Sequence, residues 1–156
     1  VWYRFSPYAY TEENGFGETG GIKYKGNYKD GKENGKWTWY GQNGQIEIEE
    51  NYKDGWKNGK YTYYYENGQI REEENYKDGK RESKSTSYYE NGQIQQEGNY
   101  RDGERDGKWT VYYDNGQIKG EVNFKGGEVL DGRYNLYKED GSMWIVEEYK
   151  DGKLIK

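Results

Sequence analysis

The chain repeats one stretch of 24 residues, and this period limits the fold more than any other feature of the sequence. Four successive copies open with the dipeptides Asn27-Tyr28, Asn51-Tyr52, Asn75-Tyr76 and Asn99-Tyr100. A fifth copy opens at Asn123-Phe124 and is one residue longer. Strict repetition at a period of about 20 to 50 residues indicates an array of one supersecondary unit, in which each copy contacts mainly its neighbours.

Each copy contains two turn signals, and two turns in 24 residues leave no room for a helix of ordinary length. The first signal is Asn-Gly, replaced by Asp-Gly in the fifth copy, and we predict a two-residue type I′ turn there. These pairs are 43–44, 67–68, 91–92, 115–116 and 140–141. The second signal is Asp-Gly, at 30–31, 54–55, 78–79 and 102–103. The sequence therefore predicts an all-β fold, an elongated antiparallel β-meander of tandem β-hairpin repeats in a mostly single-layer sheet.

A two-residue loop would also fix the register of each hairpin. The predicted cross-strand pairs are Trp37–Glu50, Trp39–Ile48, Tyr63–Glu72, Tyr65–Ile70, Trp109–Val122, Tyr113–Ile118 and Tyr137–Trp144. Because side chains alternate along a strand, one face collects aromatic rings edged by carboxylates. This aromatic face contains Trp37, Trp39, Tyr61, Tyr63, Trp109 and Tyr113. The opposite, polar face carries Lys36, Thr38, Tyr40, Glu47 and Glu49, with Tyr64, Tyr88 and Tyr112 repeating Tyr40.

The composition explains how such a sheet is stabilised and which partners it disfavours. Charged residues make up 34% of the 156 residues, which alone favours disorder, but aromatic residues make up 19%. We therefore expect aromatic ladders to replace an aliphatic core. The net charge of −5 disfavours nucleic acid and anionic membrane surfaces as partners. No apolar run is long enough to span a bilayer, so we expect no membrane insertion.

We expect one repeat domain over residues 1–156. Residues 1–26 form an N-terminal cap and a partial repeat, residues 27–148 form five hairpin repeats of 24 or 25 residues, and residues 149–156 form a truncated C-terminal repeat. No signal peptide is visible, but the chain begins at Val1 rather than Met. The sequence therefore does not separate a cytoplasmic location from an extracytoplasmic one after signal removal.

The third copy departs from the others on the aromatic face. Ser85 and Ser87 replace the tryptophans at positions 37 and 39, and Ser83 replaces a glycine. The cross-strand partners of the two serines are Gly98 and Gln96, so small and polar groups meet there. We expect a notch in the aromatic face at this point. The notch is either one decayed copy or a shaped pocket for a side chain of a partner.

The last copy departs in the opposite direction, because residues 143–146 read Met-Trp-Ile-Val and make both faces apolar. Terminal repeats are commonly atypical, since they cap an open sheet edge or join a partner. Trp144 and Val146 are therefore candidate residues for self-association into a homo-oligomer.

Catalysis and metal binding are poorly supported. Without histidine and cysteine the chain lacks the most common general base and the best nucleophile, and it has no thiol or disulfide chemistry. Glu72 and Glu74 could serve acid–base chemistry, but they recur with the repeat and are better explained as a solvated strand. The run from Asp102 to Gly107 places oxygen ligands in a turn, but it lacks the closing glutamate and spacing of a calcium loop. We therefore expect no catalytic residues, no metal site and no cofactor.

The copies fit the pattern Y-K-D-G-K-x-x-G-K-W-T-x-Y-Y-E-N-G-Q-I-x-x-E, with Gly31, Gly35, Trp37, Asn43 and Gly44 at characteristic positions. This unit closely resembles the bacterial variant of the MORN repeat, and the chain is similar to the YwqK-type antitoxin family. The resemblance covers residues 27–148 throughout and residues 18–26 weakly. It implies an elongated hairpin array that acts as a protein-interaction scaffold and neutralises a toxin, as an antitoxin or immunity protein.

Two functions remain open from the sequence. In the first, the chain is a non-enzymatic scaffold whose aromatic face and serine notch bind another protein, and that protein is a toxin. The candidate contact residues are Trp37, Trp39, Tyr61, Tyr63, Ser85, Ser87, Trp109 and Tyr113. Large rings are enriched at binding hot spots, but here they could also pack on each other as the sheet's own core. In the second, the chain is an exported or surface-associated structural repeat protein that self-associates.

Overall fold

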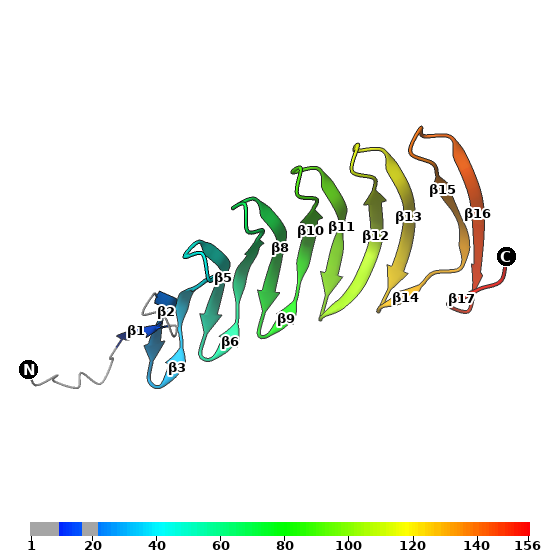
Figure 1. Cartoon of the computed structure of the whole chain (residues 1–156). Helices are drawn as coiled ribbons and strands as arrows, with labels where there is room; N and C mark the ends of the chain where they lie inside the picture. Colours follow the sequence, from blue (N-terminus) through cyan, green and yellow to red (C-terminus); the bar gives the residue numbers. More distant parts are fainter. Residues whose placement is uncertain (1–9, 17–21) are drawn as a thin grey trace, which may run out of the picture.

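The computed structural model describes residues 10–16 and 22–156, and these form one open antiparallel sheet in meander order (Figure 1). Long strands pair with their neighbours in the order β1–β2–β4–β5–β7–β8–β10–β11–β12–β13–β15–β16. The predicted all-β meander of tandem hairpins is confirmed. Of the predicted N-terminal cap, residues 1–9 and 17–21 lie outside the described residues.

Each repeat contributes an outgoing strand, a returning strand and, in most copies, a two-residue strand before the outgoing one. The outgoing strands are β4 (Gly35–Tyr40), β7 (Gly59–Tyr64), β10 (Ser83–Tyr88), β12 (Glu104–Tyr112) and β15 (Gly132–Tyr137). The returning strands are β5 (Ile46–Lys53), β8 (Ile70–Lys77), β11 (Ile94–Arg101), β13 (Ile118–Lys125) and β16 (Met143–Lys150). The short strands are β3 (Lys32–Glu33), β6 (Trp56–Lys57), β9 (Lys80–Arg81), β14 (Glu128–Val129) and β17 (Lys153–Leu154). The N-terminal pair is β1 (Tyr10–Phe16) and β2 (Ile22–Lys29).

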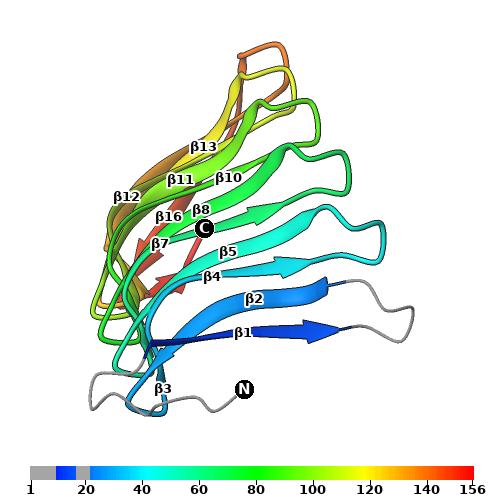
Figure 2. The same cartoon turned by 90° about the vertical axis from the view of Figure 1, so that its left-hand side faces the viewer.

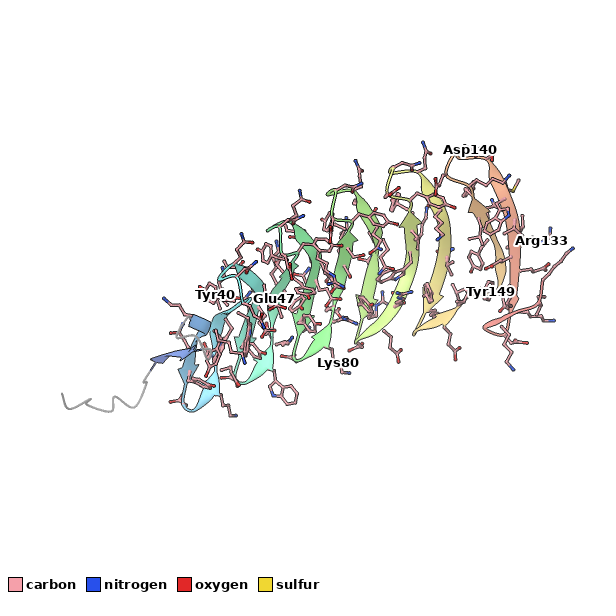
Figure 3. The ribbon with its side chains drawn as sticks, in the orientation of Figure 1. Tyr40, Glu47, Lys80, Arg133, Asp140 and Tyr149 are labelled. Atoms are coloured by element: carbon pink, nitrogen blue, oxygen red, sulfur yellow. The ribbon has the colours of Figure 1, made fainter. Side chains whose placement is uncertain are left out.

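The two turn signals lie at opposite ends of the hairpins, as Asp140 and Lys80 mark in Figure 3, and they form different turns. At Asp30-Gly31 both residues have positive φ, 51° and 76°, which defines a type I′ turn. At Asn43-Gly44 only the glycine has a positive φ, 77°. Its N–H donates to the carbonyl of Gly41 at 2.9 Å, so this is a longer loop in which the glycine follows a tight turn. The prediction of type I′ turns at the Asn-Gly pairs was therefore wrong.

The longer loop changes the register at the loop end of every hairpin. The predicted pairs Trp37–Glu50, Trp39–Ile48, Tyr63–Glu72 and Trp109–Val122 are confirmed. The register then shifts by one residue, so the predicted pairs Tyr65–Ile70, Tyr113–Ile118 and Tyr137–Trp144 are wrong. The observed pairs are Tyr64–Ile70, Tyr112–Ile118 and Tyr137–Met143. The extra loop residue is absorbed as a bulge next to the loop.

Most repeats have a second bulge between the short strand and the outgoing strand. The strands bend along their length (Figure 2). In the first repeat the bulge places Gly35 at a φ of 81°, a conformation that favours glycine. The third repeat has Ser83 there, at a φ of 66°. The fifth repeat is longer at this point, where Leu130 and Asp131 precede Gly132. Only one residue pair, Gly120–Leu136, then joins β13 to β15.

No second layer covers the sheet among the described residues, so buried side chains are buried by their neighbours on the same face. On the aromatic face these are Trp37, Trp109, Tyr134, Glu50, Glu74 and Ser85. On the polar face they are Thr62, Thr86 and Thr110. The core of this protein is therefore a set of thin side-chain ladders rather than an apolar interior.

Candidate binding surface on the aromatic face

The predicted aromatic face exists, and its first cluster of rings surrounds Trp37. The Trp37 ring lies 5.8 Å from Tyr24 and 6.2 Å from Trp39 between centroids, and both pairs are stacked. Tyr28 and Tyr52 meet it edge-on at 5.2 and 6.1 Å. Trp37 is consequently only 3% exposed. Its ring stabilises the sheet and offers little area to a partner.

Both buried tryptophans lie flat over glycines. A methyl group on Gly26 would overlap the Trp37 ring, and one on Gly98 would overlap the Trp109 ring. Trp109 is also 3% exposed, and the guanidinium of Arg105 lies 4.3 Å from its ring centroid. Large rings therefore alternate with small residues across neighbouring strands, as close packing requires.

Two buried carboxylates replace these glycines in the middle of the array. Glu50 accepts hydrogen bonds from Trp39 Nε1 at 2.8 Å and from Tyr52 Oη at 3.0 Å, and it pairs with Lys57 at 2.7 Å. Glu74 is 2% exposed, accepts a hydrogen bond from Tyr76 Oη at 2.7 Å and pairs with Arg81 at 2.7 Å. A buried charge is tolerated when it is paired and hydrogen-bonded, so these groups are structural.

The buried carboxylates change the acidity of the tyrosines beside them. Burial raises the pKa of the Tyr52 and Tyr76 phenols well above the usual value. The charge of Glu50 raises the pKa of Tyr52 further, and the hydrogen bond to Glu74 does so for Tyr76. Burial likewise raises the pKa of Tyr61 to about 12. Burial, followed by repulsion from Glu74, raises the pKa of Glu72. The three phenols are therefore neutral at physiological pH, and those of Tyr52 and Tyr76 donate hydrogen bonds to the carboxylates.

The part of the face that solvent can reach lies between the two tryptophans. Trp39, Tyr61 and Tyr63 are half-buried. The guanidinium of Arg71 lies 4.9 Å from the Tyr63 ring centroid, and the ammonium of Lys57 lies 4.8 Å from that of Tyr61. Cations over ring faces hold the rings in place. Of the predicted contact residues, these rings combine apolar area with accessibility.

The serine notch is only partly accessible to solvent. Ser85 and Ser87 pair with Gly98 and Gln96 as predicted. Ser85 is only 6% exposed, while Ser87 is half-buried. The Trp109 ring covers Gly98, the strand partner of Ser85. Ser87 is therefore the more accessible of the two serines.

Tyr113 does not lie opposite Ile118 on the aromatic face, because the register shift places it in a loop. Its hydroxyl donates to the backbone carbonyl of Tyr137 in the next repeat at 2.8 Å. Tyr65 and Tyr89 make the same contact with the carbonyls of Tyr88 and Tyr112, at 2.7 and 2.8 Å. These three residues, the loop tyrosines, fasten successive loops to each other.

The polar face carries a ladder that sequence reasoning treated as separate solvated charges. In the second repeat Lys60 pairs with Glu73, which also accepts a hydrogen bond from Tyr88 Oη at 3.2 Å. The same Lys–Glu–Tyr contacts recur at Lys36–Glu49–Tyr64 and Lys84–Glu97–Tyr112. Lys84 and Tyr112 together lower the pKa of Glu97. The signal was present in the sequence, since all three residue types recur at the 24-residue period.

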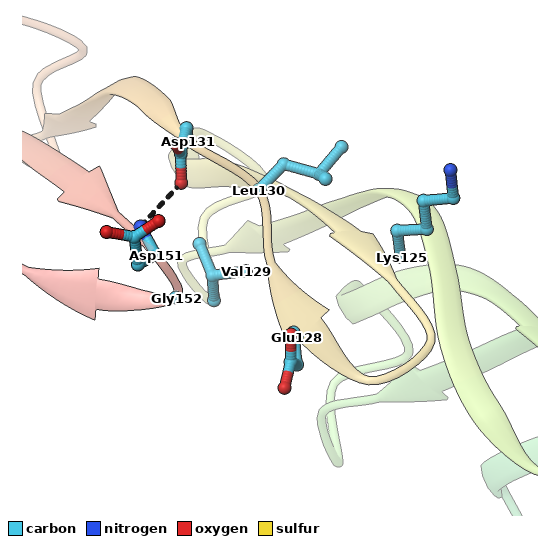
Figure 4. Close-up of a pocket in the computed structure, with 7 residues that line it drawn as sticks. All are labelled: Lys125, Glu128, Val129, Leu130, Asp131, Asp151 and Gly152. Carbon is cyan, nitrogen blue, oxygen red and sulfur yellow. Dashed lines mark hydrogen bonds between the residues drawn. The ribbon is translucent and has the colours of Figure 1, made fainter.

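The C-terminal hairpin exposes apolar side chains near the sheet edge. Trp144 is 63% exposed and Val146 is 38% exposed, and Met143 and Ile145 are exposed beside them. Val146 stands where the earlier repeats have the ladder glutamates. A hollow of about 480 Å³ lies at the other end of this hairpin, beside Leu130 and Asp131, where Asp131 accepts a hydrogen bond from the backbone N–H of Asp151 at 2.7 Å (Figure 4).

The described residues contain neither a group of His, Cys, Asp or Glu side chains that could hold a metal ion nor a helix that could cross a membrane. Glu74 is buried and Glu72 is half-buried, so the expectation that both lie on a solvated strand was wrong. Asp102 lies in a type I′ turn, and its backbone N–H donates to Glu82 at 3.0 Å.

The chain folds into one curved sheet of stacked hairpins, with side-chain contacts between successive repeats and half-exposed rings on one face. This architecture is that of the β-hairpin repeat proteins. Within that class the chain belongs to the MORN repeat variant family, whose profile matches residues 33–54, 57–78, 81–102 and 105–125. Repeats of this family are non-catalytic modules that generally bind proteins or membranes.

Comparison with curated proteins gives no match. Among solved structures, the chain is similar to one described as the crystal structure of the GtfA/B complex bound to UDP and GlcNAc, with 14% identity and a TM-score of 0.30. The match covers 72% of this chain and 22% of that chain, so the present sequence corresponds to about a fifth of its length.

Proposed function

We propose that the chain is a non-enzymatic protein-binding scaffold and that its partner contacts the aromatic face at Trp39, Tyr61, Tyr63 and Ser87. The observation that supports this proposal is the set of half-buried rings between the two buried tryptophans. Tyrosine, tryptophan and arginine are the residue types enriched at binding hot spots. Because the buried carboxylates and cations fix the rings, little side-chain entropy would be lost on binding.

The test places a photo-crosslinking amino acid, benzoylphenylalanine, at position 87 or at position 40 in the cell of origin. Ser87 lies on the aromatic face, and Tyr40 belongs to the polar-face pattern and provides a near-isosteric control. We expect a covalent protein adduct from position 87 and none from position 40. Equal adducts from both positions, or none from position 87, would contradict the proposed face.

The narrower proposal is that this partner is a toxin and the chain its antitoxin, as the resemblance to the YwqK-type family implies. The protein crosslinked at position 87 is then expressed alone and together with this chain. Growth arrest by the partner alone, relieved by co-expression, is the expected result. A partner without effect on growth would remove the antitoxin role and leave the scaffold role intact.

A second candidate function is self-association through the C-terminal hairpin. It is favoured by Trp144 and Val146, which are exposed apolar residues at positions where earlier repeats carry charged or polar groups. Monomeric proteins seldom expose such a cluster without an interaction to cover it.

A further inference from the structure

The loop tyrosines form a ladder of equivalent hydrogen bonds between successive repeats, and the first repeat lacks its tyrosine. Tyr65, Tyr89 and Tyr113 each donate a hydrogen bond to a backbone carbonyl of the following repeat. The equivalent residue of the first repeat is Gly41, and the equivalent acceptor is the carbonyl of Tyr64. Glycine has no side-chain hydroxyl, so residue 41 cannot make the contact that Tyr65 makes with the carbonyl of Tyr88.

The backbone does not require a glycine at this position. The Gly41 N–H donates to the carbonyl of Gln45 at 2.9 Å, and Tyr65 makes the equivalent bond to Gln69 at 2.8 Å. Gly41 also has no positive φ, unlike Gly44 two residues after Gln42. The first loop therefore has the same hydrogen bonds as the second but lacks the phenol ring.

A pocket of about 1090 Å³ lies where the ring is missing. Gly41, Tyr63, Tyr64 and Tyr65 contribute to its walls. The charged side chains that line it are Glu47, Glu66, Glu90 and Arg71, three carboxylates and one guanidinium. The volume lies just above the range for ligand sites, which is about 300 to 1,000 Å³, and exceeds the needs of a single ring.

We propose that this pocket binds a tyrosine side chain of a protein partner, carried on a segment with lysine or arginine beside it. The phenol takes the place that the loop tyrosines occupy in the other repeats, and its hydroxyl donates to the Tyr64 carbonyl. The flanking cations meet the excess of carboxylates. This inference rests on the proposed scaffold function and specifies one contact of the partner.

The test uses the blocked tripeptide Lys-Tyr-Lys and the whole chain, with binding followed by NMR at the amides of the first two loops. We expect saturable binding at one site, and about tenfold weaker binding of Lys-Leu-Lys, which lacks the hydroxyl and the ring. Gly41→Tyr supplies the missing ring from the chain itself and should abolish binding of the peptide. Gly41→Ala adds only a methyl group and should retain it.

Gly41→Tyr should also melt at a higher temperature than the native protein, because its hydroxyl completes the ladder; this measurement shows that the variant is folded. Unchanged peptide binding by Gly41→Tyr, or no preference for Lys-Tyr-Lys over Lys-Leu-Lys, would overturn the proposal. If the peptide fails to bind while position 87 still crosslinks a partner, only the pocket is wrong. If the peptide binds and position 87 gives no adduct, the aromatic-face proposal is wrong instead.

Discussion

Ser83 has a left-handed backbone conformation that the equivalent residues Gly35, Gly59 and Gly107 adopt without a Cβ atom. Its side chain is exposed, so its removal would cost no packing. We expect Ser83→Gly to raise the free energy of unfolding by about 1 kcal/mol, because a residue with a Cβ is strained at this φ. Urea unfolding measures this as a higher midpoint with an unchanged slope.

The matched control is Gly35→Ser, which creates the same strain in the first repeat and should lower the free energy of unfolding by a similar amount. An unchanged midpoint for Ser83→Gly would show that the strain is relieved by some other contact of Ser83.

Arg81 is the cation paired with the most deeply buried carboxylate, Glu74. Arg81→Met keeps most of the apolar stem but leaves the charge of Glu74 without its partner. We expect a loss of about 2 kcal/mol in the free energy of unfolding, the typical cost of an unsatisfied buried group. Arg71→Met, at an exposed arginine, should change it by less than about 0.5 kcal/mol. Equal effects of the two substitutions in urea unfolding would refute a structural role for the buried pair.

The raised pKa of Glu72 makes a prediction about pH. Because burial and Glu74 disfavour its charged form in the folded state, Glu72 contributes stability that is present below its unfolded pKa of about 4.3 and is lost as the pH rises through the folded pKa. Glu72→Gln, which is always neutral, should therefore be more stable than the native protein at pH 7. The difference should disappear near pH 4 in parallel urea titrations, and a constant difference at both pH values would contradict the assignment.

At the scale of single elements, most of the hairpin could be predicted from the sequence and its loop could not. The 24-residue period and the alternation of side chains predicted the pairs of Trp37 and Trp39 correctly. Asn-Gly and Asp-Gly both fit a type I′ turn, and sequence preference did not show that Asp30-Gly31 adopts it while Asn43-Gly44 does not. Because of the single-residue shift at the other loop, Ile118 pairs with Tyr112, and Tyr113 belongs to the loop tyrosines instead.

The burial of individual rings could not be predicted from the sequence either. Whether a ring on a single-layer sheet is covered depends on its neighbour in the next strand, and Gly26 and Gly98 let two tryptophans lie flat. The pattern predicted an aromatic face but not which of its rings solvent reaches.

The joint between β13 and β15 is the weakest contact between adjacent long strands among the described residues. One residue pair joins them, whereas two join β5 to β7 and β8 to β10. We expect the amides of β15 that face β13 to exchange with deuterium about tenfold faster than the equivalent amides of β7, because fewer cross-strand bonds must open. Hydrogen-exchange NMR measures both in one sample, and equal protection would show that the extra residue of the fifth repeat does not loosen the sheet.

At the scale of the whole molecule, the exposed C-terminal hairpin predicts concentration-dependent association. Sedimentation velocity should detect a dimer or larger species of the native protein at high concentration. Trp144→Ser should weaken association about 30-fold, the effect of a hot-spot residue worth about 2 kcal/mol. Lys119→Ser changes the equivalent position of the preceding repeat and should leave association unchanged. A strictly monomeric native protein would exclude this candidate function.

The contacts that hold the array together are local, and most of them recur from copy to copy. The turn glycines Gly55, Gly79 and Gly103 donate to the short strand of the preceding repeat, and the loop tyrosines reach only the following one. An in-frame duplication of 24 residues would therefore meet the same acceptors as the original and lengthen the sheet by about 10 Å, two strand spacings. Gene duplication can thus adjust the reach of such a protein in fixed steps without any new interaction having to evolve.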